Sequence, residues 1–199
     1  MHYPHFFNSL PTITFKDELA ATLGSFEDAK IEFSYLDVVK AAGHSCPTTA
    51  GAYLMLQKAM QELYIGDRLP VRGEITVELQ NRADEGVTGV MANVFTNLTG
   101  AAADVGFPGL TKRFKRTGLL EFDKNIKGQV RFTRTDSNKS VQLSYDPYVL
   151  PSNPKVIELM IEVESARASD EEKKEFQKLW QARVKEIFDN KDKVISIIT

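Results

Sequence analysis

The chain has 199 residues, a formal net charge of −2 at pH 7 and an isoelectric point near 6.0. This length suits one domain, or one domain with an appendage, and burial of about 70% of the unfolded surface makes disulfides unnecessary. The single cysteine excludes an internal disulfide, a four-cysteine zinc ribbon and a CxxC redox pair. The charge balance argues against a nucleic-acid partner, since the densest basic stretch, residues 112–116, is short.

The sequence shows no pattern typical of a membrane-spanning helix or of an export signal. No apolar run approaches the roughly 18 residues that a membrane-spanning helix needs. The N-terminal segment is broken by two prolines and lacks the long apolar core of a signal peptide. We therefore expect a cytoplasmic protein without a membrane partner.

The first predicted elements are a strand and a short helix. Residues 30–35 alternate between polar and apolar types, which predicts a strand. Ser34 and Asp37 have the spacing of a capping box, and Gly43 suits a left-handed helix end. A helix is therefore expected to finish just before His44.

A second helix is predicted to begin at once. Pro47 fits the first helical position, where its missing N–H does no harm, so Cys46 becomes the N-cap. Residues 72–80 then alternate as a strand. Residues 85–100 repeat apolar positions near a helical period, although their threonines and valines also allow a strand, and we favour a helix.

The second half of the chain contains three predicted strands and two predicted helices. The strands are residues 118–123, 128–135 and 139–146, joined by short turns. Asn153 and Pro154 open the first helix, for which we expect an inward face made by Ile157, Met160, Ile161 and Ser165.

A long amphipathic helix is predicted near the C-terminal end. Ser169 and Glu172 form a second capping box at its start. Its apolar stripe consists of Phe176, Leu179, Trp180, Val184, Ile187 and Phe188. Residues 194–198 follow as a short edge strand or a segment docked on the core. The mixed order of elements favours an α+β fold with a mixed or antiparallel sheet, a core over 1–150 and a helical extension over 151–199 that packs on the core or on a dimer partner.

His44 and Cys46 are the residues with the most chemistry. Free backbone N–H groups and the helix dipole at an N-terminus stabilise a thiolate, and an imidazole lies two positions away. This pair suits a metal site, or a nucleophile with His44 as its base. The plainer interpretation is that both residues only pack, since a lone cysteine is usually a small buried side chain.

The stretch FSYLDVVKAAGHSCPTTAGAYLM resembles the signature of the FmdE-like family, which takes its name from formylmethanofuran dehydrogenase. There a helix leads into Gly-His-x-Cys-Pro, followed by Gly-Tyr-x-Met. The matching residues are Gly43, His44, Cys46, Pro47, Tyr53 and Met55. Ala52 and Thr48 stand where the family usually has glycine. Residues 99–102, Thr-Gly-Ala-Ala, stand where it commonly has Thr-Gly-Cys-Thr, so a second thiol is missing. The resemblance spans about residues 30–125.

The resemblance implies a dimeric α+β core with His44 and Cys46 as metal ligands or as a reactive pair. Zinc is the expected metal among the divalent transition ions. Many relatives carry a further cysteine-rich zinc finger, which this chain cannot form because Cys46 is its one cysteine. The catalytic machinery of the dehydrogenase itself is understood to lie in other polypeptides of that enzyme.

A zinc site needs three or four ligands, so further candidates are required. His2 and His5 could reach the site as an N-terminal flap, whose aromatic neighbours favour docking over disorder. Asp104 could serve as a carboxylate ligand or could orient His44. Tyr53, Asn97 and Thr99 are candidates for contacting a cofactor or a small-molecule ligand.

Three hypotheses follow from these residues. The first is a metal-binding protein of the FmdE-like type, either an enzyme or an accessory protein of unknown substrate. The second is a metal-free enzyme with Cys46 as its nucleophile. The third is a non-catalytic dimeric scaffold. A homodimer is expected from the resemblance and from the apolar stripe of the C-terminal helix.

Overall fold

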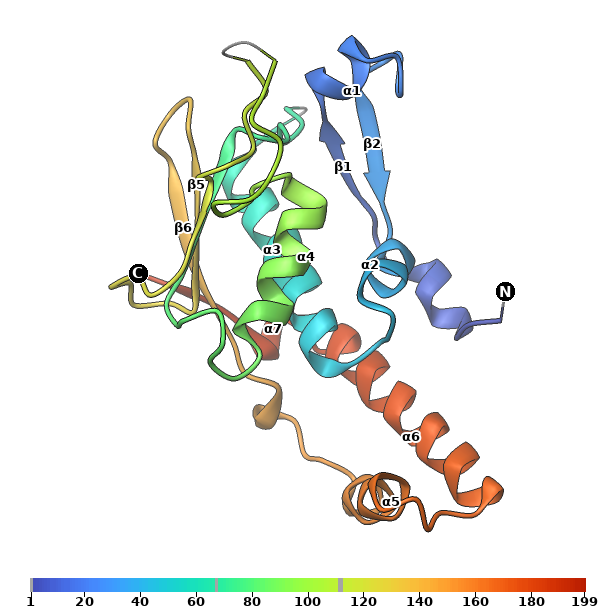
Figure 1. Cartoon of the computed structure of the whole chain (residues 1–199). Helices are drawn as coiled ribbons and strands as arrows, with labels where there is room; N and C mark the ends of the chain where they lie inside the picture. Colours follow the sequence, from blue (N-terminus) through green and yellow to red (C-terminus); the bar gives the residue numbers. More distant parts are fainter. Residues whose placement is uncertain (1, 67, 111–112) are drawn as a thin grey trace.

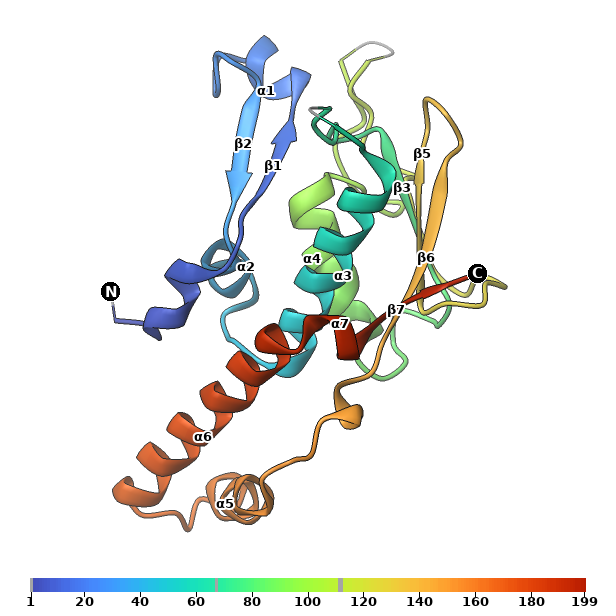
Figure 2. The ribbon, with the colours of Figure 1, turned by 180° about the vertical axis from the view of Figure 1, so that it is seen from behind.

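A five-stranded β-sheet forms one side of the protein, and helices cover one of its faces (Figures 1 and 2). The computed structural model describes residues 2–66, 68–110 and 113–199. The sheet order is β4–β3–β5–β6–β7, parallel between β3 and β4 and antiparallel between the other neighbours. Its strands are β3 Ile75–Leu79, β4 Leu120–Glu121, β5 Val130–Arg134, β6 Ser140–Tyr145 and β7 Ile195–Ile198. The expected α+β class with a mixed sheet is confirmed.

The strands bury every second residue, as their sequences predict. On the covered face, Phe132 of β5 meets Phe95 of α4, Thr88–Thr99, edge to face with ring centroids 5.0 Å apart. On the opposite face, Glu78 and Arg131 lie directly across from each other and form an ion pair. The segment 85–100, whose sequence allowed a helix or a strand, contains the helix α4. Its apolar side chains pack on the covered face of the sheet.

α3, Pro47–Leu63, is the central helix of the fold. It lies between the sheet and the other helices, so its buried residues surround nearly its whole circumference. The sequence pattern places the end of this helix at Gly66, but the helix ends at Leu63, because Tyr64 already adopts extended backbone. α2, Tyr35–Ala42, packs against both α3 and α4, and its capping box and left-handed Gly43 are present as predicted.

An arm of two strands stands apart from the main sheet (Figure 1). β1, Ile13–Lys16, pairs with β2, Lys30–Phe33, and α1, Glu18–Thr22, lies at its tip. Asp17 joins this arm to the body, because its carboxylate accepts a hydrogen bond from Arg116 at 2.8 Å and pairs with Arg72 at 3.3 Å.

The N-terminal segment is docked, as its aromatic residues predicted. The 3-10 helix η1, His5–Ser9, buries Phe7, whose ring contacts Tyr35 of α2 edge to face at 5.1 Å. Phe6 and Phe7 also pack against each other. The histidines of this segment, His2 and His5, remain exposed.

The C-terminal part crosses the lower end of α3 and then returns to the sheet (Figure 2). A short 3-10 helix, η2, Pro147–Val149, leads to α5, Pro154–Glu164, and α6, Asp170–Asp189. α7, Lys191–Val194, precedes β7, which pairs with β6. The capping box at the start of α6 is present as predicted. None of the helices in the described segments is both long and apolar enough to span a membrane.

The predicted inward face of α5 is wrong for Ile157, Ile161 and Ser165, whereas Met160 is half-buried. Ile157 and Ile161 are 53% and 52% exposed, whereas Leu159 is buried. The reason is that α5 packs chiefly against α6, so one face of the helix is covered, whereas Ile157 lines an open groove between the two helices and stays exposed. Ser165 is exposed as well.

Candidate functional site

A tight turn carries His44 out of α2 and into α3. Gly43 adopts a left-handed conformation with φ of 78°, which releases the chain from the helix. The imidazole Nδ1 lies 3.0 Å from the carbonyl oxygen of Ala42. In a neutral imidazole this makes Nδ1 the protonated nitrogen, which leaves the lone pair on Nε2. His44 is exposed, so Nε2 is accessible to a ligand from solvent.

Cys46 is the N-cap of α3, as predicted. Its Sγ accepts a hydrogen bond from the Thr49 N–H at 3.5 Å, and Thr49 Oγ1 in turn accepts from the Cys46 N–H at 3.1 Å. This reciprocal pair replaces two of the backbone partners that a helix start lacks. The thiol is half-buried, so it is neither sealed in the core nor fully open to solvent.

A group of hydroxyls lies directly beneath the turn. Tyr35 Oη is 3.0 Å from Ser45 Oγ and 3.1 Å from Thr49 Oγ1. Burial raises the pKa of Tyr35 to about 12, against a smaller opposite effect of these two hydrogen bonds. The phenol therefore stays protonated at neutral pH and links the turn to the first turn of α3.

The turn is also held from α6. Trp180 Nε1 donates to the Ser45 carbonyl oxygen at 3.0 Å, and Gln181 Nε2 donates to the same oxygen at 3.3 Å. Sequence reasoning placed Trp180 in an apolar stripe and left out Gln181. The signal that could have found them is weak, because a buried indole or amide needs a polar partner but the sequence does not say which.

His44 lines a hollow of about 260 Å³ between α2 and α4. Apolar residues form part of its wall, and Asn93, Thr96 and Asn97 of α4 supply polar groups. The structure thus brings together two of the predicted residues, His44 and Asn97. The carbonyl oxygen of Asn97 is already occupied by a hydrogen bond from Arg72, which fixes the backbone there.

A larger groove of about 530 Å³ adjoins Pro47, the residue after the thiol. Its walls come from η2, α5 and α6, and they include Tyr148, Ile157, Met160 and Trp180. Trp180 therefore contributes both to this apolar groove and to the hydrogen bonds that hold the Ser45 carbonyl.

Other predicted residues serve the core. Tyr53 is fully buried, with its hydroxyl 2.7 Å from the Pro11 carbonyl oxygen and 3.1 Å from that of Phe33. Burial is also the main reason why its pKa is raised. Thr99 is fully buried and donates to the Phe95 carbonyl at 2.6 Å. The hydroxyl groups of both residues are occupied by backbone partners.

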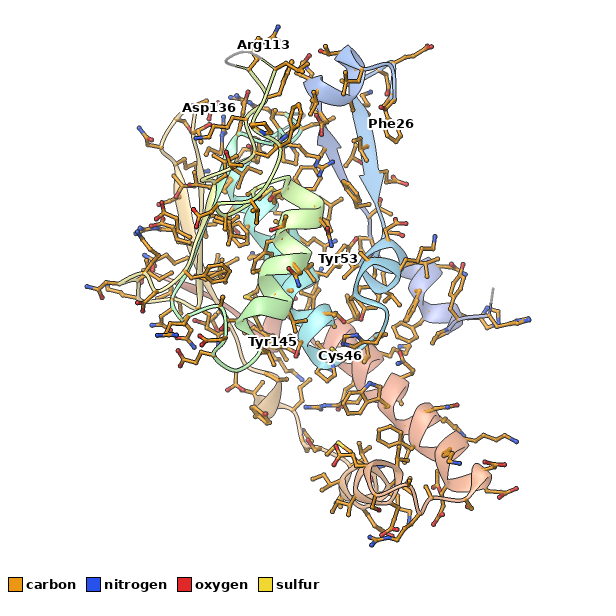
Figure 3. All side chains as sticks on the ribbon, in the orientation of Figure 1. Phe26, Cys46, Tyr53, Arg113, Asp136 and Tyr145 are labelled. Carbon is orange, nitrogen blue, oxygen red and sulfur yellow. The ribbon has the colours of Figure 1, made fainter. Side chains whose placement is uncertain are left out.

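The remaining ligand candidates are not gathered at the turn. His2, His5 and Asp104 are exposed, and no three His, Cys, Asp or Glu side chains among the described residues are placed to share a metal ion. Arg113 lies at the upper end of the molecule, well above Cys46 (Figure 3). Lys112, its neighbour in the basic stretch, lies outside the described residues.

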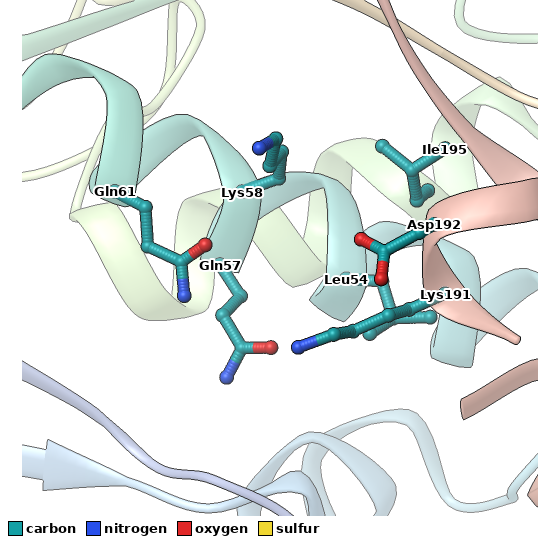
Figure 4. A pocket seen from close by; sticks show the side chains of 7 residues that line it. All are labelled: Leu54, Gln57, Lys58, Gln61, Lys191, Asp192 and Ile195. Carbon is teal, nitrogen blue, oxygen red and sulfur yellow. The ribbon is translucent and has the colours of Figure 1, made fainter. Parts of the chain in front are cut away.

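A further small hollow lies between α3 and the segment of α7 and β7 (Figure 4). Its volume is about 40 Å³, which leaves room for little more than water. Gln57, Lys58, Gln61 and Asp192 supply its polar groups, and none of the predicted site residues reaches it.

The fold and the turn define an α+β domain whose candidate site lies at the start of its central helix. Residues 41–196, more than three quarters of the chain, match the family model described as FmdE, molybdenum formylmethanofuran dehydrogenase operon. The chain therefore belongs to the FmdE family. The match extends through α5, α6 and into β7, well beyond residue 125, where the resemblance seen in the sequence ends. Comparison with curated proteins gives no match.

Proposed function

We propose that this FmdE-family protein binds a divalent transition metal, with zinc as the expected ion, through His44 Nε2 and Cys46 Sγ. One observation carries the proposal. The contact of His44 Nδ1 with the Ala42 carbonyl leaves Nε2 as the free lone pair, two residues before a half-buried thiol. A carbonyl on the second ring nitrogen is the usual way in which proteins orient a metal-binding histidine.

The two donor atoms, an imidazole nitrogen and a thiolate sulfur, suit zinc, but one chain supplies only these two of the proposed ligands. Imidazole nitrogen and thiolate sulfur are preferred zinc ligands, and zinc takes four ligands in all. The other positions would be filled by a second copy of the chain, by the exposed His5 or His2 after a movement of the N-terminal segment, or by solvent and a small-molecule ligand. A metal with an open position would polarise a carbonyl group or acidify water.

The metal-free nucleophile is less well supported. His44 Nδ1 is bonded to Ala42, Cys46 Sγ is bonded to Thr49, and no hydrogen bond joins the two side chains. A nucleophile and its base normally lie within hydrogen-bond reach of each other. We therefore retain metal binding as the single candidate function.

We also propose that the protein is a homodimer. The support is the apolar surface on α5 and beside it: Ile157, Ile161 and Val149 are each more than half exposed, and Tyr148 is 87% exposed. Exposed apolar side chains that adjoin a groove are typical of an interaction surface.

Elemental analysis of the purified protein tests the metal site. We expect about one equivalent of a transition metal per chain, and Cys46→Ser and His44→Gln should each lose it while the protein stays folded. His5→Gln tests whether the N-terminal segment supplies a ligand. If this variant retains the metal, the remaining ligands come from a second copy of the chain or from solvent. Two results would overturn the proposal: wild-type protein that contains no metal although it was never exposed to a chelator, or a metal content in Cys46→Ser equal to that of the wild type.

A further inference from the structure

The backbone between the two candidate ligands is bonded to a helix far away in the sequence. Ser45 lies between His44 and Cys46, and its carbonyl oxygen accepts two hydrogen bonds from α6, from Trp180 and from Gln181. The orientation of this one peptide group helps to set the direction in which both neighbouring side chains leave the turn.

The amide of Gln181 is oriented by this contact. Its Oε1 is buried and has no hydrogen-bond partner among the described residues, whereas its Nε2 lies 3.3 Å from the Ser45 oxygen. The contact with the Ser45 oxygen is therefore the one hydrogen bond of this amide within the described part of the chain, and it favours this orientation of the amide. The indole of Trp180 is supported separately, because its ring packs on Phe176 with centroids 5.6 Å apart.

We propose that Trp180 and Gln181 are positioning residues of the His44–Cys46 site. This inference rests on the proposed metal-binding function. Both side chains act through the Ser45 carbonyl and touch neither the metal nor a ligand. Their effect is to make α6 a control element of the site. Without the two bonds, the Ser45 carbonyl loses its donors, the turn is held only through its contacts with Tyr35 and Thr49, and the directions of the two ligand side chains are less tightly set.

Two substitutions remove the donors and keep, respectively, an aromatic ring at position 180 and the side-chain size at position 181. Trp180→Phe keeps an aromatic ring against Phe176 and removes the indole N–H. Gln181→Glu is isosteric and places a carboxylate oxygen, which cannot donate, against the Ser45 carbonyl. Gln177→Glu, one turn earlier on the exposed side of α6, is the matched control because it makes the same chemical change away from the turn.

Two readouts are measured on the full chain. In metal-free protein, alkylation at a fixed pH reports on Cys46 alone, because the chain has one cysteine. Trp180→Phe should raise the alkylation rate about threefold or more, because a looser turn opens access to the sulfur. Gln181→Glu should raise it by less, because its carboxylate disfavours the thiolate that reacts. With Co²⁺ as the probe, both variants should weaken binding about tenfold and alter the thiolate-to-cobalt absorption band, as expected when groups that orient metal ligands are removed.

The outcomes separate this inference from the proposed function. Alkylation at or below the wild-type rate in both folded variants, or effects equally large in Gln177→Glu, would overturn the positioning role. Failure of the wild-type protein to bind Co²⁺ would count against the metal site itself, and the alkylation rates would still decide whether α6 controls the turn. Circular dichroism and thermal unfolding confirm that each variant is folded.

Discussion

The ring of Tyr145 occupies the space in which a side chain on Gly51 would stand. A Cβ added to Gly51 would lie 2.3 Å from Cε1 of that ring. The phenol then donates to the Pro47 carbonyl oxygen at 2.8 Å. The close approach of β6 to the first turns of α3 therefore depends on a residue without a side chain, and this approach places the helix start that carries Cys46 (Figure 3).

Gly51→Ala should destabilise the protein by about 1 kcal/mol net, measured by denaturant unfolding. An alanine inside a helix normally stabilises it by about 1 kcal/mol relative to glycine. Here the methyl group would overlap the Tyr145 ring, and overpacking of a core costs about 1–3 kcal/mol. In a Tyr145→Leu background the same substitution should be neutral or stabilising; an equal loss in both backgrounds would contradict the steric explanation.

Asp17→Asn should lower the free energy of unfolding by about 3 kcal/mol, because removing one partner of a buried ion pair leaves uncompensated charge. The side chains of Asp17 and Arg116 are 6% and 8% exposed, and Arg72 shares the same carboxylate. Asparagine can still cap α1, so the change isolates the charge. Glu18→Gln is the matched control: its partner Lys16 is exposed, and no measurable change is expected.

Asp136→Asn should reduce stability at neutral pH, and the loss should become smaller as the pH falls. Hydrogen bonds from Arg134, with smaller contributions from Ser137 and Arg68, hold the pKa of Asp136 well below its usual value. A lowered folded-state pKa stabilises the folded protein above the unfolded pKa of about 3.9, and this stabilisation is lost as pH falls toward the folded-state value. The difference in Tm between wild type and variant should therefore shrink between about pH 5 and pH 3. A constant difference over that range would exclude this linkage.

Ile157→Ser combined with Ile161→Ser should leave each chain folded and weaken self-association. Both side chains are more than half exposed, so their loss removes little from the fold of one chain. Sedimentation velocity should show a dimer dissociation constant raised about tenfold or more, as expected from the loss of buried apolar area. Val163→Ser, on the half-buried side of α5, should instead lower thermal stability. Identical sedimentation of wild type and double variant would remove Ile157 and Ile161 from the interface.

The local features of the fold were predictable from the sequence because their causes are local. The capping boxes at Ser34 and Ser169, the left-handed Gly43 and the N-cap at Cys46 each depend on residues within a few positions. Each was confirmed. The alternating strands were also confirmed, since one face of the sheet is buried under helices.

The features that failed or were missed depend on distant partners. The face of α5 was assigned wrongly because periodicity finds an apolar stripe without saying what covers it. The ion pair between Asp17 and Arg116 joins residues 99 positions apart, and no local sequence pattern at either residue predicts it. For the candidate site, the local pair His44 and Cys46 could be proposed from the sequence because the two residues are close in the chain, and it stays a prediction; no further ligand could be derived from composition.

Ser45 and Trp180 are 135 positions apart, and this separation has a consequence for the order of assembly. During synthesis the turn with its imidazole and thiol emerges long before α6 exists, and N-terminal parts of a chain generally fold first. Until α6 docks, the Ser45 carbonyl lacks both of its donors from that helix. The turn therefore reaches its finished geometry late, so the imidazole and the thiol are more loosely held in the nascent chain than in the released protein.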